Sequence, residues 1–324
     1  MAKQAVLLLA HGTPETVDQI PEYLRNVVSG RPLPKRVVEE IQHRYSLIGR
    51  SPLTEMTFEQ ARLVALELAN SGEGTPVYVA MRNWRPYIPD VVRRMRADGV
   101  EEAAVVCMAP HNSRTSVGLY RRSIAAEGEG LRFDFTDGWA QHPLLIEAFA
   151  ERLRPAYARF SAEAGEPVPV LFTAHSVPCR TVQSSTLDEG MPRFWPGTGA
   201  DPYAEEAKQT AALVAASVPE IPQWYFAFQS QGASGGPWLG PTVEQTLESL
   251  AASGVRTLLL QPIGFLCDHV EILYDVDILF RDFAARLHMR LERPESLNAS
   301  VTLARAVADL ARQGLRRLDR NGHS

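Results

Sequence analysis

Residues 170–178 read VLFTAHSVP, and residues 6–14 read VLLLAHGTP. Each stretch is a short apolar run that ends in Ala-His, a small residue, one further residue and proline. Continuous apolar runs of this length are typical of strands that are covered on both faces of a parallel sheet. The near-repeat therefore predicts that the chain uses one strand-and-turn plan twice, with His11 and His175 at equivalent strand ends.

The similarity between the two halves of the chain extends beyond these two strands. Residues 89–100, PDVVRRMRADGV, lead into the apolar run 103–111, and residues 241–255, PTVEQTLESLAASGV, lead into the apolar run 257–265. Both are amphipathic helical patterns that end near a glycine and continue into a strand. Alternating strands and helices predict parallel sheets with right-handed crossovers. We expect an α/β protein made of two similar doubly wound domains of the flavodoxin or Rossmann type.

The expected domains are residues 1–150 and 151–324, with the boundary in the polar helical stretch 145–167. The last stretch, 285–324, has a helical pattern with apolar positions at Leu303, Val307 and Leu310. From the sequence alone this helix can pack on either domain.

Composition excludes several classes of function. A net charge of −5 gives no overall basic field for nucleic acid. The three cysteines form no CxxC pair, so neither a zinc knuckle nor an iron–sulfur cluster is expected. The N-terminus has no cleavage signal, and no apolar run approaches the roughly 20 residues that cross a bilayer. We expect a cytoplasmic protein that is not stably inserted in a membrane.

Open α/β sheets bind ligands beyond the carboxyl ends of their strands. His11 and His175 lie at such ends, so two facing domains would bring both to one cleft. A histidine at a strand end is often satisfied by backbone groups alone. The buried strand and the Ser-Val-Pro turn that follows favour a functional role for His175.

The stretch 262–283, PIGFLCDHVEILYDVDILFRDF, predicts a helix that begins at Asp268, a good N-cap. On that helix Asp268, Glu271 and Asp275 share one face, whereas His269 and Glu271 point to different faces. Acidic faces are usually just solvated, but clustered carboxylates at a binding edge need a proton or cation among them. Imidazole and carboxylate donors favour Fe²⁺ or Co²⁺ over Mg²⁺, and few ligands would hold the ion loosely.

Two further stretches can contact a ligand. The basic stretch 21–51 is either a polar helical cover or a source of cations, especially Arg44 and Arg50, for ligand carboxylates. The glycine-rich stretch 231–241, QGASGGPWLGP, lacks the spacing of a dinucleotide or phosphate-binding loop. It is more simply a turn that presents Trp238 to the cleft.

These features together resemble the ferrochelatase family, whose members insert iron into porphyrin. The resemblance spans nearly the whole chain in order, through LLLAHGTP, RYSLIGRSPL, VAMRNWRPYI, APHNSRTSVGLY, FTAHSVP, FQSQGASGGPWLGP and PIGFLCDHVEILYDVD. It implies the chelatase fold, with the active site in the cleft between the domains. It also implies that His175 and Glu271 are the paired catalytic and metal-site residues, and that Asp275 continues an acidic path for the metal. The same resemblance implies that the tetrapyrrole and its propionates contact Arg44, Tyr45, Ser51 and Tyr120.

The blocks APHNSRTSVGLY and QSQGASGGPWLGP look more like the coproporphyrin III branch of the family than the protoporphyrin IX branch. The resemblance implies a porphyrin and ferrous iron as substrates, no resident cofactor, and at most transient contact with neighbouring heme-pathway enzymes. His11 stands where the coproporphyrin enzymes usually have tyrosine, and we hypothesise that it is an axial ligand of the metal. Leu279 ends the acidic line one turn past Asp275.

For the mechanism, we expect Trp139 and Trp238 to clamp the ring faces and His175 to accept a pyrrole proton. Glu271 would hold Fe²⁺ or relay protons toward Asp275. Three alternatives remain from the sequence: a protoporphyrin IX ferrochelatase, a cobalt or nickel chelatase, and a two-lobed tetrapyrrole or metal carrier without catalysis.

Overall fold

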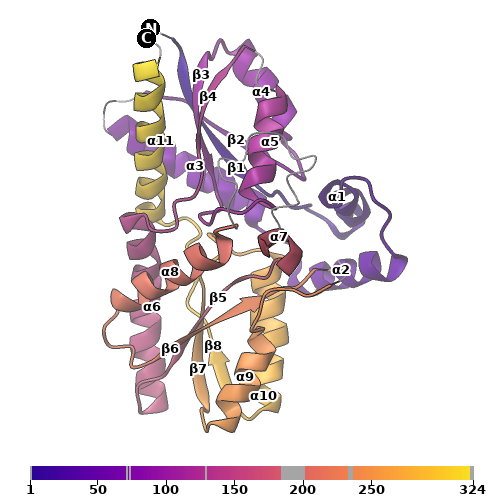
Figure 1. Cartoon of the computed structure of the whole chain (residues 1–324), viewed down its shortest axis with the longest axis vertical. Helices are drawn as coiled ribbons and strands as arrows, with labels where there is room; N and C mark the ends of the chain where they lie inside the picture. The colour runs from indigo at the N-terminus through magenta and orange to yellow at the C-terminus, as the bar shows by residue number, and fades with distance from the viewer. Residues whose placement is uncertain are drawn as a thin grey trace.

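The computed structural model describes residues 2–70, 72, 74–127, 130–183, 201–232 and 236–321, which form two stacked lobes (Figure 1). Each lobe is built on a four-stranded parallel sheet within this described part. The strand order is β2-β1-β3-β4 in the first sheet and β6-β5-β7-β8 in the second, so the repeated plan is confirmed. The strands are β1 (Gln4–Ala10), β2 (Val77–Met81), β3 (Glu102–Cys107), β4 (Arg132–Thr136), β5 (Val170–His175), β6 (Trp224–Gln229), β7 (Thr257–Pro262) and β8 (Arg290–Glu292).

The two quoted stretches are the second strand of each sheet. In β1, Leu7 pairs with Tyr78 of β2 and Val105 of β3. In β5, Leu171 pairs with Tyr225 of β6 and Leu260 of β7. Because both strands have a neighbour on each side and helices on their faces, every side chain from 5 to 10 and from 170 to 174 is buried.

The turn after β1 requires glycine. Gly12 has a φ of +78°, and a Cβ placed on it would lie 2.8 Å from the Cβ of Met81. In the second lobe the equivalent residue is Ser176, which is fully buried and donates its hydroxyl to the carbonyl of Leu239 at 2.8 Å. The two turns therefore reach the same position by different chemistry, and both hold a histidine at the end of a buried strand.

The helices cover both faces of the sheets (Figure 1). None of the described helices is long and apolar enough to cross a bilayer. The α-helices are α1 (Ile20–Val27), α2 (Lys35–Ile48), α3 (Leu53–Asn70), α4 (Ile88–Ala97), α5 (Val117–Glu127), α6 (Pro143–Ala164), α7 (Cys179–Gln183), α8 (Tyr203–Ala216), α9 (Val243–Ala252), α10 (Arg281–Arg286) and α11 (Val301–Asn321), and a π-helix spans Glu271–Phe280.

The chain does not divide cleanly at residue 150. That position falls inside α6, and α11 returns to the first lobe, where it packs on β3, β4 and α3 (Figure 1). A Cβ on Gly314 would lie 2.8 Å from the Cβ of Ala104, so α11 approaches β3 very closely. The range 151–324 therefore does not describe one lobe: residues 301–321 pack on β3, β4 and α3 of the first lobe and on α6, and Leu303 and Val307 belong to a buried cluster that runs through both lobes. The stretch before α11 also contains β8, which the helical pattern missed.

Candidate active site

His175 and Glu271 face each other. His175 is the last residue of β5, and Glu271 is the first residue of the π-helix. The Nε2 atom of His175 lies 3.3 Å from Oε1 of Glu271, and the two side chains are 31% and 29% exposed. The strand end and the helix start thus bring together an imidazole and a carboxylate that a ligand can reach.

The orientation of the His175 ring is fixed by the backbone. Its Nδ1 donates to the carbonyl of Ser176, which leaves Nε2 turned toward Glu271. The hydroxyl of Tyr203 donates to the carbonyl of His175 at 2.8 Å and holds the strand end in place. Burial disfavours the imidazolium, but the Glu271 carboxylate and the Ser176 carbonyl outweigh it, so the pKa of His175 is raised. This ring is therefore suited to accept a proton at Nε2.

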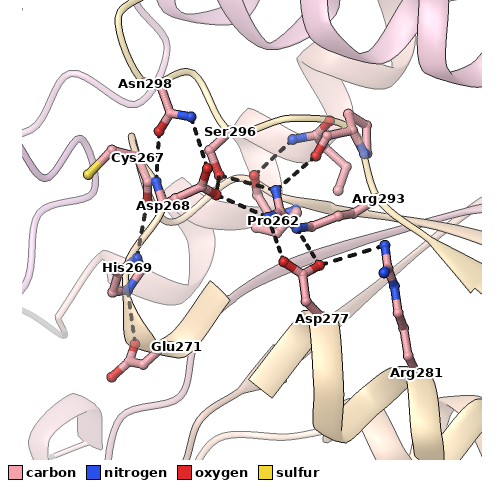
Figure 2. Close-up of polar contacts among 12 residues, drawn as sticks. Pro262, Cys267, Asp268, His269, Glu271, Asp277, Arg281, Arg293, Ser296 and Asn298 are labelled. Atoms are coloured by element: carbon pink, nitrogen blue, oxygen red, sulfur yellow. Dashed lines mark hydrogen bonds and ion pairs between the residues drawn. The ribbon is translucent and has the colours of Figure 1, made fainter. Parts of the chain in front are cut away.

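A second imidazole lies on the other oxygen of Glu271. The Nε2 atom of His269 is 3.5 Å from Oε2 of Glu271, and its Nδ1 donates to the carbonyl of Cys267 at 3.1 Å (Figure 2). The expectation that His269 and Glu271 point apart is wrong. The helix begins at Glu271, after the N-cap Val270, so α-helical spacing does not apply to His269.

The prediction that Asp268 is the N-cap of this helix is wrong for the same reason. Asp268 precedes the helix instead of capping it, and its carboxylate accepts hydrogen bonds from Ser296 Oγ at 2.7 Å and Asn298 Nδ2 at 2.9 Å (Figure 2). It also pairs with Arg293 at 3.1 Å. Asp268 therefore does not share an acidic face with Glu271 and Asp275.

Glu271 carries its negative charge between two imidazoles. Burial favours the neutral acid, but His175 and His269 outweigh it and hold the pKa of Glu271 well below its usual range. Histidines that bind metals commonly donate their other ring nitrogen to a carbonyl, as both imidazoles do here. Within the described residues, no group of three His, Cys, Asp or Glu side chains stands ready to hold a metal ion.

Asp275 follows Glu271 along the π-helix and lies almost fully buried. Its Oδ2 accepts from Ser230 Oγ at 2.5 Å, and its Oδ1 lies 3.3 Å from Nη1 of Arg44. Burial and the neighbouring Glu271 carboxylate raise the pKa of Asp275 to about 6, even though Ser230 and Arg44 oppose the shift. Asp275 can therefore gain and lose a proton near neutral pH.

Arg44 links the first lobe to this site. It extends from α2, pairs with Glu40 at 2.5 Å as well as with Asp275, and lies 5.0 Å above the ring of Tyr274. Its Nε is buried and has no hydrogen-bond partner among the described residues. The Arg44 side chain is 26% exposed, so its guanidinium can donate charge-assisted hydrogen bonds to a ligand carboxylate.

His11 directly follows β1, the strand of the first lobe that corresponds to β5. Its Nε2 is 2.9 Å from the hydroxyl of Tyr23, and Nδ2 of Asn83 is 3.2 Å from its Nδ1. Burial lowers the pKa of His11 to about 3, and the nearby charges of Arg82, Glu271 and the other histidines add smaller effects. His11 is therefore neutral at ordinary pH and close enough to Glu271 to feel its charge.

Three residues that the resemblance assigns to porphyrin contact are all buried: Tyr45, Ser51 and Tyr120. The hydroxyls of Tyr45 and Ser51 have no hydrogen-bond partner of good geometry within the described part of the chain. Burial and the Glu271 charge both raise the pKa of Tyr45, which places its hydroxyl within the field of the site. Tyr120 packs in the core of the first lobe beneath Arg82, whose guanidinium lies 5.6 Å from its ring centre.

The two tryptophans differ. Trp139 is a core residue whose Nε1 donates to the carbonyl of Cys107 at 3.0 Å, so the expectation that it clamps the porphyrin is corrected. Its indole satisfies the end of β3 and packs with α6, which leaves only 4% of it exposed. Trp238 is half-buried, and its ring lies against Gly232. Residues 233–235 of the glycine-rich stretch lie outside the described residues.

Sequence reasoning missed several residues that shape the site. Asn83 and Ser230 lie in blocks that carry the resemblance but were given no role there, Tyr23 lies outside those blocks, and only the fold brings the three to His11 and Asp275. His269 had a signal in its sequence, because His-x-Glu directly after a strand can place both side chains at the strand end. The assumed start of the helix at Asp268 hid that signal.

Comparisons with known proteins agree with this geometry. The ferrochelatase family model matches residues 3–315. The chain is 59% identical over 317 residues to a ferrochelatase of Acidobacterium capsulatum, an alignment that covers 98% of this chain and 96% of that one. It is 33% identical to a coproporphyrin III ferrochelatase of Mycolicibacterium vanbaalenii, with 96% and 89% covered.

Solved structures support the fold. The sirohydrochlorin chelatase SirB from Bacillus subtilis subspecies spizizenii, in complex with cobalt, has a TM-score of 0.57 at 11% identity, with 96% of this chain and 95% of that chain covered. This likeness confirms the chelatase fold. The family match over residues 3–315 and the 59% identity to a ferrochelatase show that the chain belongs to the ferrochelatase family, enzymes that insert a metal ion into a porphyrin in heme biosynthesis.

Proposed function

We propose that the chain inserts Fe²⁺ into coproporphyrin III to give coproheme. The carboxylate of Glu271 between the imidazoles of His175 and His269 is the observation that carries this proposal. The coproporphyrin branch is supported by similarity to a coproporphyrin III ferrochelatase, and Arg44 is the proposed partner of one substrate carboxylate, a group that both porphyrins carry. Both iron and porphyrin are substrates in this scheme.

In the proposed mechanism, His175 removes protons from the porphyrin. A free porphyrin carries two inner N–H groups, and a divalent ion can take their place only when both protons leave. The raised pKa of His175 and its outward Nε2 suit it to accept such a proton. General-base help of this kind typically contributes about 10²–10⁴-fold.

Glu271 and Asp275 have different proposed tasks, binding of the incoming cation and uptake of the released protons. Glu271 stays ionised because its pKa is depressed, so it is better suited to hold the incoming cation than to carry a proton. Asp275, with a pKa of about 6, is the better acceptor for protons that leave the site. The sequence-based expectation gave both tasks to Glu271, and the charges around it favour the first.

The porphyrin must also be bent before a metal can enter. Only interactions that are stronger in the distorted ring than in the flat ring accelerate the reaction. We propose that Arg44, Tyr45 and Ser51 hold the ring by its edge, since within the described residues neither hydroxyl has a hydrogen-bond partner of good geometry, and that Trp238 contacts a ring face. His11 is the proposed axial group on the side opposite His175.

The test is metal insertion by purified wild type, His175→Ala and the control His43→Ala, which changes an exposed histidine on α2. Initial rates are measured anaerobically with Fe²⁺ and either coproporphyrin III or protoporphyrin IX, and porphyrin binding is measured by fluorescence. We expect His175→Ala to lose at least about 100-fold in rate while it still binds porphyrin, and His43→Ala to match wild type.

Two results would contradict the proposal. Retained turnover by His175→Ala would remove the assigned role of that residue. A higher rate with protoporphyrin IX than with coproporphyrin III would move the chain to the other branch, and porphyrin binding without any insertion would indicate a carrier.

A further inference from the structure

Arg293 lies outside the cluster of His175, His269 and Glu271 and yet contacts the segments on both sides of His269 and Glu271. It follows β8, and its side chain reaches toward the start of the π-helix (Figure 2). Only 10% of this side chain is exposed. A nearly buried guanidinium requires charge partners, and Arg293 has two.

The first partner is Asp277, within the π-helix. Arg293 donates from Nε to Oδ1 and from Nη2 to Oδ2, both at 2.7 Å, which is a planar bidentate pair (Figure 2). The second partner is Asp268, just before the helix, whose Oδ1 lies 3.1 Å from the same Nη2. One guanidinium therefore joins the loop that precedes the helix to a residue beyond the first turn.

Asp268 is held from further directions as well. Its carboxylate accepts from Ser296 and Asn298, and its backbone N–H donates to Oδ1 of Asn298 at 2.8 Å. The carbonyl of Asn298 in turn accepts from Nε2 of Gln60 at 2.9 Å, a residue of α3 in the first lobe. The position of Asp268 is thus fixed relative to both lobes.

His269 and Glu271 lie in the chain between these two anchored carboxylates. Among the described residues, the His269 ring hydrogen-bonds to the Cys267 carbonyl, and the Glu271 carboxylate has the two imidazoles as its ion-pair partners. Their relative orientation therefore depends on where the backbone on either side is held. A π-helix, with i to i+5 hydrogen bonds, is rarely stable over a long run and needs such outside contacts.

We propose that Arg293 is a positioning residue for metal insertion: through Asp268 and Asp277 it sets the spacing of His269 and Glu271 toward the metal. This rests on the proposed function, in which Glu271 holds the incoming ion. Lysine cannot replace arginine here, because an ammonium group cannot form the bidentate pair with Asp277 while it also reaches Asp268.

The test compares Arg293→Lys with Arg317→Lys. Arg317 of α11 also forms a bidentate pair, with Asp134 of β4, at 2.7 and 2.9 Å, far from the His175–Glu271 cluster in the chain and on the first lobe. Each variant is assayed well below its own melting temperature for porphyrin affinity, kcat, the apparent KM for Fe²⁺ and the ratio of Zn²⁺ to Fe²⁺ insertion. These last two readouts report on metal geometry, which a loss of stability alone does not change.

We expect Arg293→Lys to raise the apparent KM for Fe²⁺ by about 10-fold or more and to change the Zn²⁺ to Fe²⁺ ratio, with porphyrin affinity unchanged. Arg317→Lys should leave all four quantities at wild-type values. If Arg293→Lys does not fold, Asp277→Asn removes the bidentate partner while it keeps the size of the side chain, and the same result is expected.

A variant that melts earlier but keeps the wild-type KM for Fe²⁺ and the wild-type metal ratio would overturn the proposal. Failure of the proposed function looks different, because then wild type itself would insert no metal. An active wild type with unaltered Arg293→Lys and Asp277→Asn kinetics would remove only the positioning role.

Discussion

Arg44 and Asp275 form an ion pair between α2 and the π-helix, with Nη1 and Oδ1 3.3 Å apart. They are 231 positions apart in the chain. The pair connects the group proposed to bind a porphyrin carboxylate with the group proposed to receive protons. A porphyrin carboxylate that binds Arg44 would therefore compete with Asp275 for the same guanidinium.

Replacing Arg44 should weaken porphyrin binding. We expect Arg44→Ala to raise the dissociation constant of coproporphyrin III by about 10-fold, because a charge-assisted contact to a carboxylate is lost. Fluorescence titration measures it. The control is Arg36→Ala, which removes the same charge from an exposed site on α2. Equal effects of the two substitutions would indicate general electrostatic attraction instead of a specific contact.

Asp275 should make stability depend on pH in a defined direction. Its pKa of about 6 lies above the ordinary value of about 3.9 for an unfolded chain. The folded state thus binds the proton more tightly than the unfolded chain. The contribution of protonated Asp275 to the free energy of unfolding is therefore complete below about pH 4 and is lost as pH rises through about 6. Asparagine does not ionise, so Asp275→Asn keeps its stability as the pH rises. Its free energy of unfolding should exceed that of wild type by about 2 kcal/mol at pH 8, with a smaller difference at pH 5.

Thermal unfolding of both proteins across this pH range checks that expectation, with the exposed Asp18→Asn as control. A stability difference that does not vary between pH 5 and pH 8 would show that Asp275 is ionised throughout.

His11 should be detectable in the spectrum of the metallated product. Because its pKa is about 3, the imidazole is neutral between pH 5 and 8, and a ring nitrogen that exchanges its contact with Tyr23 or Asn83 for the metal can act as a ligand through this range. We expect His11→Ala to shift the Soret band of bound iron coproporphyrin, whereas His43→Ala leaves it in place. An identical band in wild type and His11→Ala would exclude His11 as an axial ligand.

Trp139 should matter for stability alone. Trp139→Phe leaves the Cys107 carbonyl without its indole donor, and an unsatisfied buried acceptor costs about 1–3 kcal/mol. Urea unfolding measures this loss, and the porphyrin dissociation constant should stay at the wild-type value. Trp224→Phe, at a tryptophan 38% exposed, is the control with little effect on stability. Weakened porphyrin binding by Trp139→Phe would return this residue to the list of ring contacts.

The twin sheets were predictable because buried parallel strands leave a strong local signal. The apolar runs of β1 and β5 locate the strands, and glycine at the helix ends marks where each helix gives way to the next strand. The alternation of strands and helices along the chain follows from these two signals. The location of His175 followed from the same signal, since a residue at a strand end can be placed once the strand is known. The pairing of His175 with Glu271 came from resemblance and agrees with the geometry.

The remaining features depend on contacts between distant segments. The π-helix has the apolar spacing of an ordinary helix, and Asp268, which precedes it, is held by Arg293 and Asn298 from another part of the chain. A buried tryptophan and a half-buried tryptophan look alike in sequence, so Trp139 could not be separated from Trp238. The sequence also did not decide which lobe α11 packs on, although Gly314 indicates a close approach to a neighbouring element.

The return of α11 to the first sheet has a consequence for biosynthesis. Residues 301–321 leave the ribosome only after β5 through β8 have been made. Until then β3 and α3 lack the helix that covers them, and their apolar surface stays open to chaperones and to self-association. The amino-terminal half of the protein therefore cannot mature before the carboxyl-terminal half, and the two must reach their native packing together.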